Sequence, residues 1–312
     1  MNEKWEGEDL VDPQKVPMSL FFDVDHFVRP KETLMPRHTQ VLPGGKGLNQ
    51  ACACAKGKAQ TWMAGKIGTD GTLLLDTLNK AGVDTTFVEI EKDKLSGRAV
   101  IQRDREAENC ILLDPGANHA LDKEDFEKVL VHVGPEDIVL IQNEISNLDV
   151  LARLLKEKGS FVVFNPAPVT EDMPDDLSFV SCLVVNEVEV EQLLGESGKP
   201  EFLCKEWLKR YPDSSIVLTL SSSGSLYLDK EKTIFMPAYK VHAVDTTGAG
   251  DTYTGFLCAM LDRGFLIETA LRYASAASAI AVTMPGAASS IPNLDAVKEK
   301  IEQNEDVCPI RR

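Results

Sequence analysis

The sequence predicts an α/β fold, with a mostly parallel central sheet, helices on both of its faces and a small second sheet beside it. Two observations predict this fold. From about residue 59 onward, short apolar stretches alternate with amphipathic stretches of helical period, as they do in βα units. Several helical stretches also end at a glycine, which is common where a helix stops. The 312 residues, 43% of them hydrophobic, are enough for a single domain with a sizeable core.

Each element of the central layer follows from a local pattern. The strands of the sheet are expected at 60–64, 137–142, 160–165, 182–186 and 215–220. The stretch 72–82 predicts a helix, because its leucines fall on one helical face and Gly82 stops it. The stretch 148–159 has the same pattern. Two more helices are expected after residue 250, and the second, 268–282, is rich in Ala and Ser, which suits close approach of another helix or of a flat ligand.

Two stretches, 26–43 and 96–114, break this alternation. Their β-rich residues are typical of antiparallel ribbons, and the second has a charged turn between residues 103 and 108. We expect them to form a small lid sheet over about 20–43 and 96–114, within a single domain of residues 1–312. Such a sheet can cover a cleft or pair with a second copy of the chain, so a homodimer through the lid is one expectation. Residues 1–19 form an atypical N-terminal segment.

The composition excludes several classes of function. A net charge of −16 and an isoelectric point near 4.8 argue against binding to nucleic acid or to an anionic membrane, which both need clustered Lys and Arg. No apolar run is long enough to span a bilayer, and the N-terminus is acidic and polar, so we expect a cytoplasmic protein. Seven scattered cysteines and five dispersed histidines predict reduced thiols and no structural zinc. Small-molecule chemistry is the remaining expectation.

The segment DTTGAGD (245–251) carries the clearest chemical signal. A glycine-rich turn opens a helix here, so the backbone amides of Gly248, Ala249 and Gly250 are expected to form an anion hole. Asp251 stands beside that hole and can accept a proton from an attacking hydroxyl. This combination suits phosphoryl transfer from ATP to the hydroxyl of a small molecule. The alternative is an ordinary helix start, at which an acidic side chain is favourable.

A second glycine-rich segment, PGGKGLNQA (43–51), also precedes a helix. Its spacing is not that of a P-loop. Gly44 and Gly45 allow a polyol to approach the backbone closely, while Lys46 and Asn49 supply donors for hydroxyl groups. A plain junction between a loop and a helix is the alternative.

Both segments resemble the signatures of the ribokinase-like (PfkB) carbohydrate kinases. Shorter matches follow in family order at IQNE (141–144), NPAP (165–168), NEVE (186–189), TL (219–220) and AVTMPGAASSIP (281–292). The resemblance covers roughly residues 26 to 300, and the motifs are most similar to the ribokinase branch. It implies a three-layer α/β/α sandwich with a small β lid, with ATP near the C-terminal half and the sugar between lid and core.

The resemblance also implies roles for individual residues. It assigns the sugar to Gly44, Gly45, Lys46, Asn49 and Glu144, and the nucleotide to Asn186, Thr219, Ser221 and Gly224. It assigns Mg²⁺, held through water, to Glu189, and a monovalent cation such as K⁺ to Asp245, Thr247, Gly286 and Ser290. For Asn186 and Glu189, a helix cap is the alternative, because N-x-x-E is also a capping pattern.

The sequence departs from the family at the first strand, where an Asp normally grips the sugar hydroxyls. Alignment without gaps places Pro17 and Ser19 at the usual Asn and Asp positions, and neither has the two acceptor oxygens of a carboxylate. A gapped alignment enlists Asp23 or Asp25 instead. We favour the ungapped one, because a deletion within the lid would change its register. Lys31 and Ser221 each stand where the family has glycine.

Two hypotheses from different classes therefore remain. The first is an active carbohydrate kinase, with D-ribose as the favoured substrate and another sugar, a sugar acid or a nucleoside as alternatives. The second, motivated by the missing Asp, is a kinase-fold protein that binds a nucleotide or a regulatory partner without efficient catalysis.

Overall fold

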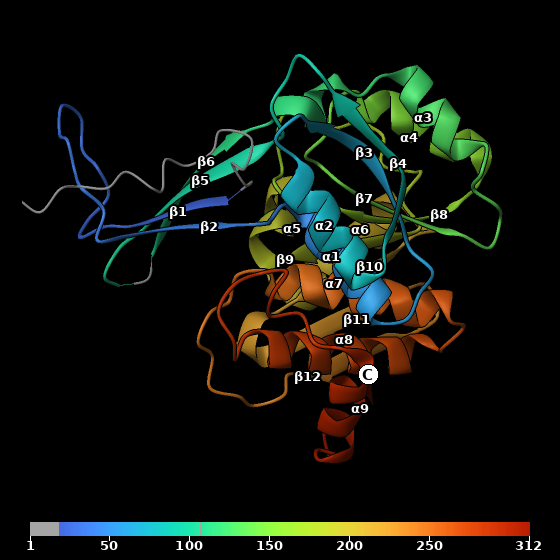
Figure 1. Ribbon diagram of the computed structural model, residues 1–312. Helices are drawn as coiled ribbons and strands as arrows, with labels where there is room; N and C mark the ends of the chain where they lie inside the picture. The colour runs from blue at the N-terminus through green and yellow to red at the C-terminus, as the bar shows by residue number, and fades with distance from the viewer. Residues whose placement is uncertain (1–18, 107) are drawn as a thin grey trace, which may run out of the picture.

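A computed structural model describes residues 19–106 and 108–312 (Figure 1). Its main sheet has seven strands in the order β13-β12-β11-β10-β9-β8-β7. The strands are β7 (Ile138–Gln142), β8 (Phe161–Asn165), β9 (Cys182–Asn186), β10 (Ser215–Thr219), β11 (Gly224–Leu228), β12 (Thr233–Pro237) and β13 (Ile310–Arg311). Neighbouring strands are parallel from β7 to β10 and antiparallel beyond β10, so the sheet is mixed. Four of the five predicted core strands are confirmed here.

Helices cover both faces of this sheet. They are α1 (Lys46–Lys56), α2 (Thr72–Ala81), α3 (Lys123–Leu130), α4 (Leu148–Lys158), α5 (Glu187–Leu194), α6 (Pro200–Arg210), α7 (Ala249–Asp262), α8 (Ile267–Ala281) and α9 (Leu294–Glu302). Because side chains alternate along a strand, Val163 packs with α1, α2 and α7 to α9, whereas its neighbours Val162 and Phe164 pack with α3 to α6. The α/β fold is confirmed, and so are the helices predicted at 72–82 and 148–159.

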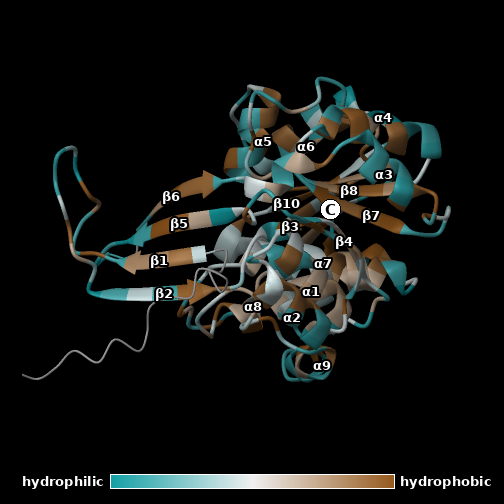
Figure 2. Cartoon of the chain, turned by 45° about the horizontal axis from the view of Figure 1, so that its top comes forward, coloured by the Kyte–Doolittle hydropathy of each residue, from teal (hydrophilic) through white to brown (hydrophobic). Residues whose placement is uncertain are grey.

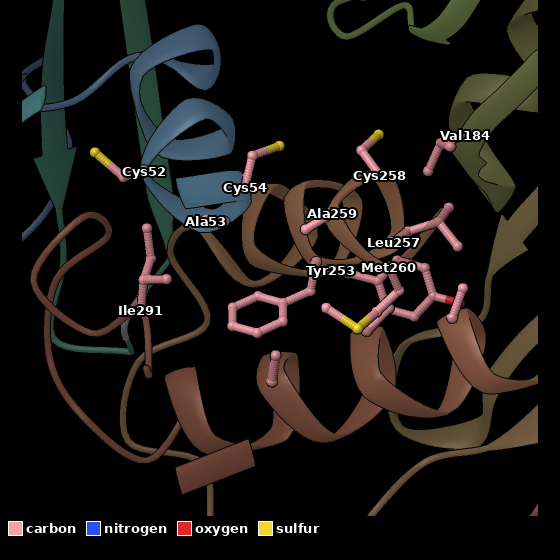
Figure 3. Close-up of a cluster of buried hydrophobic side chains, with 14 of the residues drawn as sticks. Cys52, Ala53, Cys54, Val184, Tyr253, Leu257, Cys258, Ala259, Met260 and Ile291 are labelled. Carbon is pink, nitrogen blue, oxygen red and sulfur yellow. The ribbon is translucent and has the colours of Figure 1, made fainter. Parts of the chain in front are cut away.

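Helices α1 and α7 approach each other closely at Gly255 of α7, a contact that we call the α1–α7 seam. A Cβ on Gly255 of α7 would overlap the Cβ of Ala53 on α1 and lie 2.6 Å from the carbonyl oxygen of Gln50. The thiol of Cys54 donates to the Gly255 carbonyl at 3.3 Å, and Figure 3 shows Cys54 and Cys258 on the two neighbouring helices. Because only glycine permits this approach, Gly255 lets the two helices pack directly against each other.

The small residues of α8 serve helix packing, one of the two alternatives for 268–282. Its alanines 270, 274 and 277 are fully buried, and α8 packs along α7. The hydroxyl of Ser278 also donates to the carbonyl of Ala249 at 3.0 Å, which anchors the first residue of α7. All seven cysteines are free thiols, as predicted.

The strand predicted at 60–64 does not join the main sheet. It forms β3 (Trp62–Gly68), which pairs in parallel with β4 (Asp84–Glu91) in a separate two-stranded sheet. Within residues 19–106 and 108–312, β3 and β7 each pair with a strand on one side and have no strand partner on the other. Hydrophobic periodicity predicts a strand but not its neighbours, which explains this error. Lys66 of β3 forms a largely buried ion pair with Asp125 of α3, at 2.7 Å, which joins the small sheet to that helix.

A four-stranded sheet projects from the core (Figures 1 and 2). Its order is β2-β1-β5-β6, from β1 (Ser19–Asp23), β2 (His38–Leu42), β5 (Arg98–Arg103) and β6 (Asn109–Asp114). The ribbon predicted at 96–114 is the β5–β6 hairpin. The ribbon predicted at 26–43 is right for β2 and wrong for its first part, because residues 24–37 contain no strand and β2 pairs antiparallel with β1 instead. Pro30 and Pro36 lack the amide hydrogens that a ladder needs. Most of the atypical segment, residues 1–18, lies outside the described residues.

Two of the departures from the family occur where the backbone favours glycine. Lys31 has a φ of 69° and Ser221 a φ of 50°. A side chain in this left-handed region costs roughly 1 kcal/mol. At both positions the backbone therefore has a conformation that favours glycine, although this chain has another residue there.

Candidate active site

A pocket of about 190 Å³ lies at the carboxyl ends of β8, β9 and β10, beside the starts of α1, α5 and α7. Open α/β sheets commonly bind ligands at this edge. Seven residues predicted from the sequence line it, namely Lys46, Asn186, Glu189, Thr219, Gly248, Gly250 and Asp251. Asn165, Ala167, Val184, Val185 and Thr254 line it as well. The pocket therefore joins residues of both glycine-rich segments.

The start of α7 presents backbone amides to this pocket. Its N-cap, Gly248, has a φ of 73° and offers no side-chain cap. A Cβ added to Gly250 would meet no atom within 4 Å, so the backbone there borders open space. The amide of Ala249 does not contribute as expected, because it donates to the carbonyl of Thr246 at 3.2 Å. Gly248 and Gly250 thus remain as the anion-binding candidates at this helix start.

Two amide side chains of α1 hold Asp251. Asn49 Nδ2 donates to Asp251 Oδ2 at 2.8 Å, and Gln50 Nε2 donates to Asp251 Oδ1 at 3.0 Å. Burial raises the pKa of the Asp251 carboxyl above its ordinary value, while Lys46 and the two amides act to lower it. Both carboxylate oxygens are therefore oriented by α1.

Gln50 belongs to a longer chain of amides that the sequence reasoning missed. Its Nε2 also donates to Asn165 Oδ1 at 2.8 Å, and its Oε1 accepts from Gln142 Nε2 at 2.6 Å. Asn165 Nδ2 in turn donates to the carbonyl of Val184 at 2.9 Å. All three amides lie inside motifs visible in the sequence, GGKGLNQ, IQNE and NPAP, but nothing in those letters indicates that they bond to one another.

The residues predicted to contact sugar gather around the start of α1. Lys46 Nζ lies 3.6 Å from Glu144 Oε1. Burial raises the pKa of Glu144, Lys46 acts to lower it and the Asp251 charge acts to raise it. Gly45 is the N-cap of α1. A Cβ on Gly44 would overlap the buried Ser19 hydroxyl, which places Ser19 directly against the glycine pair.

The two carboxylates of the gapped alternative lie elsewhere. Asp23 accepts from Arg103 Nε at 2.8 Å, and Asp25 accepts from Arg105 Nε at 2.8 Å. Neither Asp lines the pocket. Pro17 lies outside the described residues.

On the other side of the pocket, Asn186 and Glu189 form a capping box at the start of α5. Asn186 Oδ1 accepts the Glu189 amide, and Glu189 Oε2 accepts the Asn186 amide, both at 2.9 Å. The two residues therefore cap a helix and line the pocket at once. Thr219 lies beside Asn186 on the neighbouring strand. Ser221 lies in the turn that follows β10, Gly224 begins β11, and neither is among the lining residues.

Asp245 links two segments predicted to bind a monovalent cation. Its Oδ1 accepts the Thr247 amide and its Oδ2 accepts the Gly286 amide, both at 2.9 Å. Burial acts to raise the pKa of Asp245, but the Gly286 and Thr247 bonds outweigh it, so the pKa is lowered. The Ser290 hydroxyl, buried in the same loop as Gly286, donates to the carbonyl of Ala287 at 2.9 Å.

The fold and the pocket together define an α/β protein with a candidate small-molecule site at the carboxyl ends of its strands. Comparison with known proteins identifies the family. Residues 15–294 match the model of the pfkB family carbohydrate kinases. Among curated proteins, the chain is 34% identical to the ribokinase of Haemophilus influenzae over 287 residues, which are 89% of this chain and 94% of that protein. It is 30% identical to the deoxyribokinase of Salmonella typhi over 285 residues, 88% of this chain and 92% of that protein.

Solved structures agree with this result. The ribokinase of Thermotoga maritima matches with a TM-score of 0.81 and 32% identity over 92% of this chain and 96% of that one. The Arabidopsis thaliana ribokinase complexed with ribose and ATP matches with a TM-score of 0.82 and 28% identity, at the same coverage. The chain therefore belongs to the pfkB family of carbohydrate kinases. It is a phosphotransferase that acts on a sugar.

Proposed function

We propose that this kinase transfers the terminal phosphoryl group of ATP to a hydroxyl of D-ribose, with Asp251 as its base. The observation that carries the proposal is the position of Asp251, which lines the pocket between the start of α7 and the residues of GGKGLNQ. Ribose is favoured because the motifs are most similar to ribokinases and because a related protein is known with ribose and ATP.

The residues around the pocket suggest how the reaction proceeds. The Asp251 carboxylate accepts the proton of the sugar hydroxyl as that oxygen attacks the phosphoryl group. The amides of Gly248 and Gly250 stabilise the charge that develops on the phosphate oxygens. Lys46 and Glu144 orient the sugar. Asn49 Oδ1 is buried without a hydrogen-bond partner in the described part of the chain, which fits an acceptor for a sugar hydroxyl.

ATP, Mg²⁺ and K⁺ are the proposed cofactors. Mg²⁺ keeps several waters and takes one or two carboxylates plus phosphates, so Glu189 fits as its water-mediated partner. Asn186 and Thr219 border the same pocket and fit the nucleotide. The Asp245 carboxylate, which links the segments of Thr247 and Gly286, fits a monovalent cation. Among the described residues, no group of three or more His, Cys, Asp or Glu side chains is arranged to hold a metal.

A coupled ADP-release assay tests the proposal. We expect turnover with D-ribose that needs Mg²⁺ and increases with K⁺, and less turnover with 2-deoxyribose, hexoses, sugar acids and nucleosides. Activity that is greater with one of the other acceptors would reassign the substrate. A folded protein that binds ADP but turns over no acceptor would favour the binding or regulatory role instead.

Ser19 offers a test of the sugar site. Replacing Ser19 with Asp puts a carboxylate against Gly44, where the family has one, and a charge-assisted bond to a hydroxyl is worth about 1.5–3 kcal/mol. We expect the KM for ribose to fall about tenfold, with the KM for ATP unchanged. Ser19→Asn, of equal size and without charge, is the control. A sugar KM that does not fall in Ser19→Asp argues against a sugar contact at this position.

We also propose a homodimer formed through the lid. Every residue of the edge strand β6 is exposed, including Ile111, Leu112 and Leu113 at 52%, 66% and 55%. An apolar edge strand favours pairing with another chain. In sedimentation experiments, we expect a dimer that Leu112→Asp converts to a monomer. Val131→Asp, at an equally exposed apolar residue next to α3, should remain dimeric. A wild-type monomer at micromolar concentration would contradict the proposal.

Among residues 19–106 and 108–312, none of the helices has both the length and the apolar character that crossing a membrane requires.

A further inference from the structure

Gln50 is a fully buried polar side chain for which the proposed mechanism has no role. It is the next residue after Asn49, yet it lines no part of the pocket. Burying an amide without hydrogen bonds costs about 1–3 kcal/mol, so a buried glutamine is expected to have partners that need it. Those of Gln50 are Gln142, Asn165 and Asp251.

The geometry of these bonds constrains Gln50 from several sides. Its Oε1 accepts from Gln142 at the end of β7, which directs its NH₂ group away from that strand. The two hydrogens of the NH₂ group then go to Asn165 at the end of β8 and to Asp251 Oδ1 on α7. All of its polar valences except one acceptor lone pair are therefore used.

The backbone of Gln50 is equally fixed. Its carbonyl oxygen lies at the α1–α7 seam, against the position that a Gly255 Cβ would occupy. The seam holds the Gln50 backbone against Gly255, which lies one helical turn after Asp251 on α7. The Gln50 side chain therefore has little freedom to move relative to the Asp251 carboxylate. Asn49 donates to the other carboxylate oxygen of Asp251, Oδ2. Unlike Asn49, Gln50 is not predicted to contact the sugar.

We propose that Gln50 is a positioning residue for Asp251. The chain of amides from Gln142 through Gln50 to Asn165 aims a hydrogen bond at Oδ1, so that Oδ2 points to the attacking hydroxyl in one orientation. This inference rests on the proposed role of Asp251 as the base. It predicts that loss of the Gln50 donor impairs catalysis by Asp251 rather than the binding of sugar or nucleotide.

The charged groups that face Asp251 define the background for a test by pH. They are Lys46 on α1, Glu144 after β7 and Glu189 on α5. None of them is changed in the variants below. A donor to a carboxylate favours the charged form, so its removal moves the titration of Asp251 to higher pH.

The test compares Gln50→Met, which fills the space without a donor, with Cys54→Ala, which weakens the α1–α7 seam without touching Asp251. We expect Gln50→Met to lower kcat about tenfold, with the KM values for ribose and ATP within about twofold of wild type. The acidic limb of the kcat profile should move up by about one pH unit. Cys54→Ala should leave that limb in place.

A second readout does not depend on activity. In the ligand-free protein, ¹³C NMR of the aspartate carboxyls can follow Asp251, assigned by the loss of its signal in Asp251→Asn. We expect its titration to shift upward in Gln50→Met. If Gln50→Met does not fold, Gln50→Glu keeps the shape and adds a carboxyl, and should shift the titration further upward.

The outcomes separate the two ideas. An unchanged Asp251 titration and acidic limb in the Gln50 variants would overturn the positioning role, even if kcat falls. An active Asp251→Asn would instead overturn the proposed base, whatever the Gln50 variants do.

Discussion

Replacement of Asp251 with Asn should lower kcat about 10³-fold, the middle of the range that a general base contributes. Asn fills the same space but cannot accept the proton of the sugar hydroxyl. The NH₂ group of the new Asn side chain would also face the donors of Asn49 and Gln50, which bind a carboxylate in the wild-type protein. Since ATP and sugar are bound by other residues, both KM values should change little. The ADP-release assay with D-ribose measures the effect, and thermal unfolding checks that the variant is folded.

The control for this variant is Asp262→Asn, at the exposed C-terminal end of the same helix. It removes an equal charge from α7 and should keep the wild-type kcat. The wild-type pH profile adds a second check. Because burial raises the pKa of Asp251, kcat should fall as the pH is lowered while still above the range in which ordinary aspartates titrate. An Asp251→Asn enzyme within tenfold of the wild-type kcat would rule out Asp251 as the base.

Replacement of Gly250 with Ala should lower kcat about 10²-fold, the typical cost of disturbing one donor to a developing oxyanion. The new methyl group would enter open space in the pocket, where the phosphate oxygens must approach the backbone. No atom within 4 Å opposes that methyl group. Alanine is also a better helix former than glycine, so the free energy of unfolding should stay unchanged or increase by up to about 1 kcal/mol.

A loss of activity without a loss of stability would therefore identify the start of α7 as the anion site. Gly134→Ala is the matched control, since its Cβ would make only an ordinary contact, at 3.4 Å, with Asp137. Kinetic assays and urea unfolding of both variants give the comparison. A wild-type kcat in Gly250→Ala would mean that the phosphate oxygens do not bind at the backbone of this glycine.

The sequence predicted the fold class because the periodicity of β7 to β10 and of α2 and α4 is local and strong. It also predicted site residues from distant motifs that line one pocket, such as Lys46, Glu189 and Asp251. Pairing between distant elements was harder to predict. Nothing local to 60–64 says that β3 pairs with β4 and not with the main sheet, and nothing near residue 38 says that β2 pairs with β1.

The amide chain was missed for a related physical reason. Gln50, Gln142 and Asn165 are neutral side chains whose hydrogen bonds depend on three-dimensional distance, and neutral amides are common in any sequence. Ala249 shows the opposite error. A glycine-rich turn suggested three free amides, but the tight turn itself uses the Ala249 amide to bind Thr246.

The α1–α7 seam also determines when the catalytic centre can form. Gln50 and Asp251, like Cys54 and Gly255, are 201 residues apart in the chain. At the usual rate of synthesis, α1 leaves the ribosome roughly 10 to 40 seconds before its partner helix. Contacts of such long range slow folding. In that interval, the seam side of α1 has no α7 to pack against, so the nascent chain is most exposed to aggregation and to chaperones before α7 emerges.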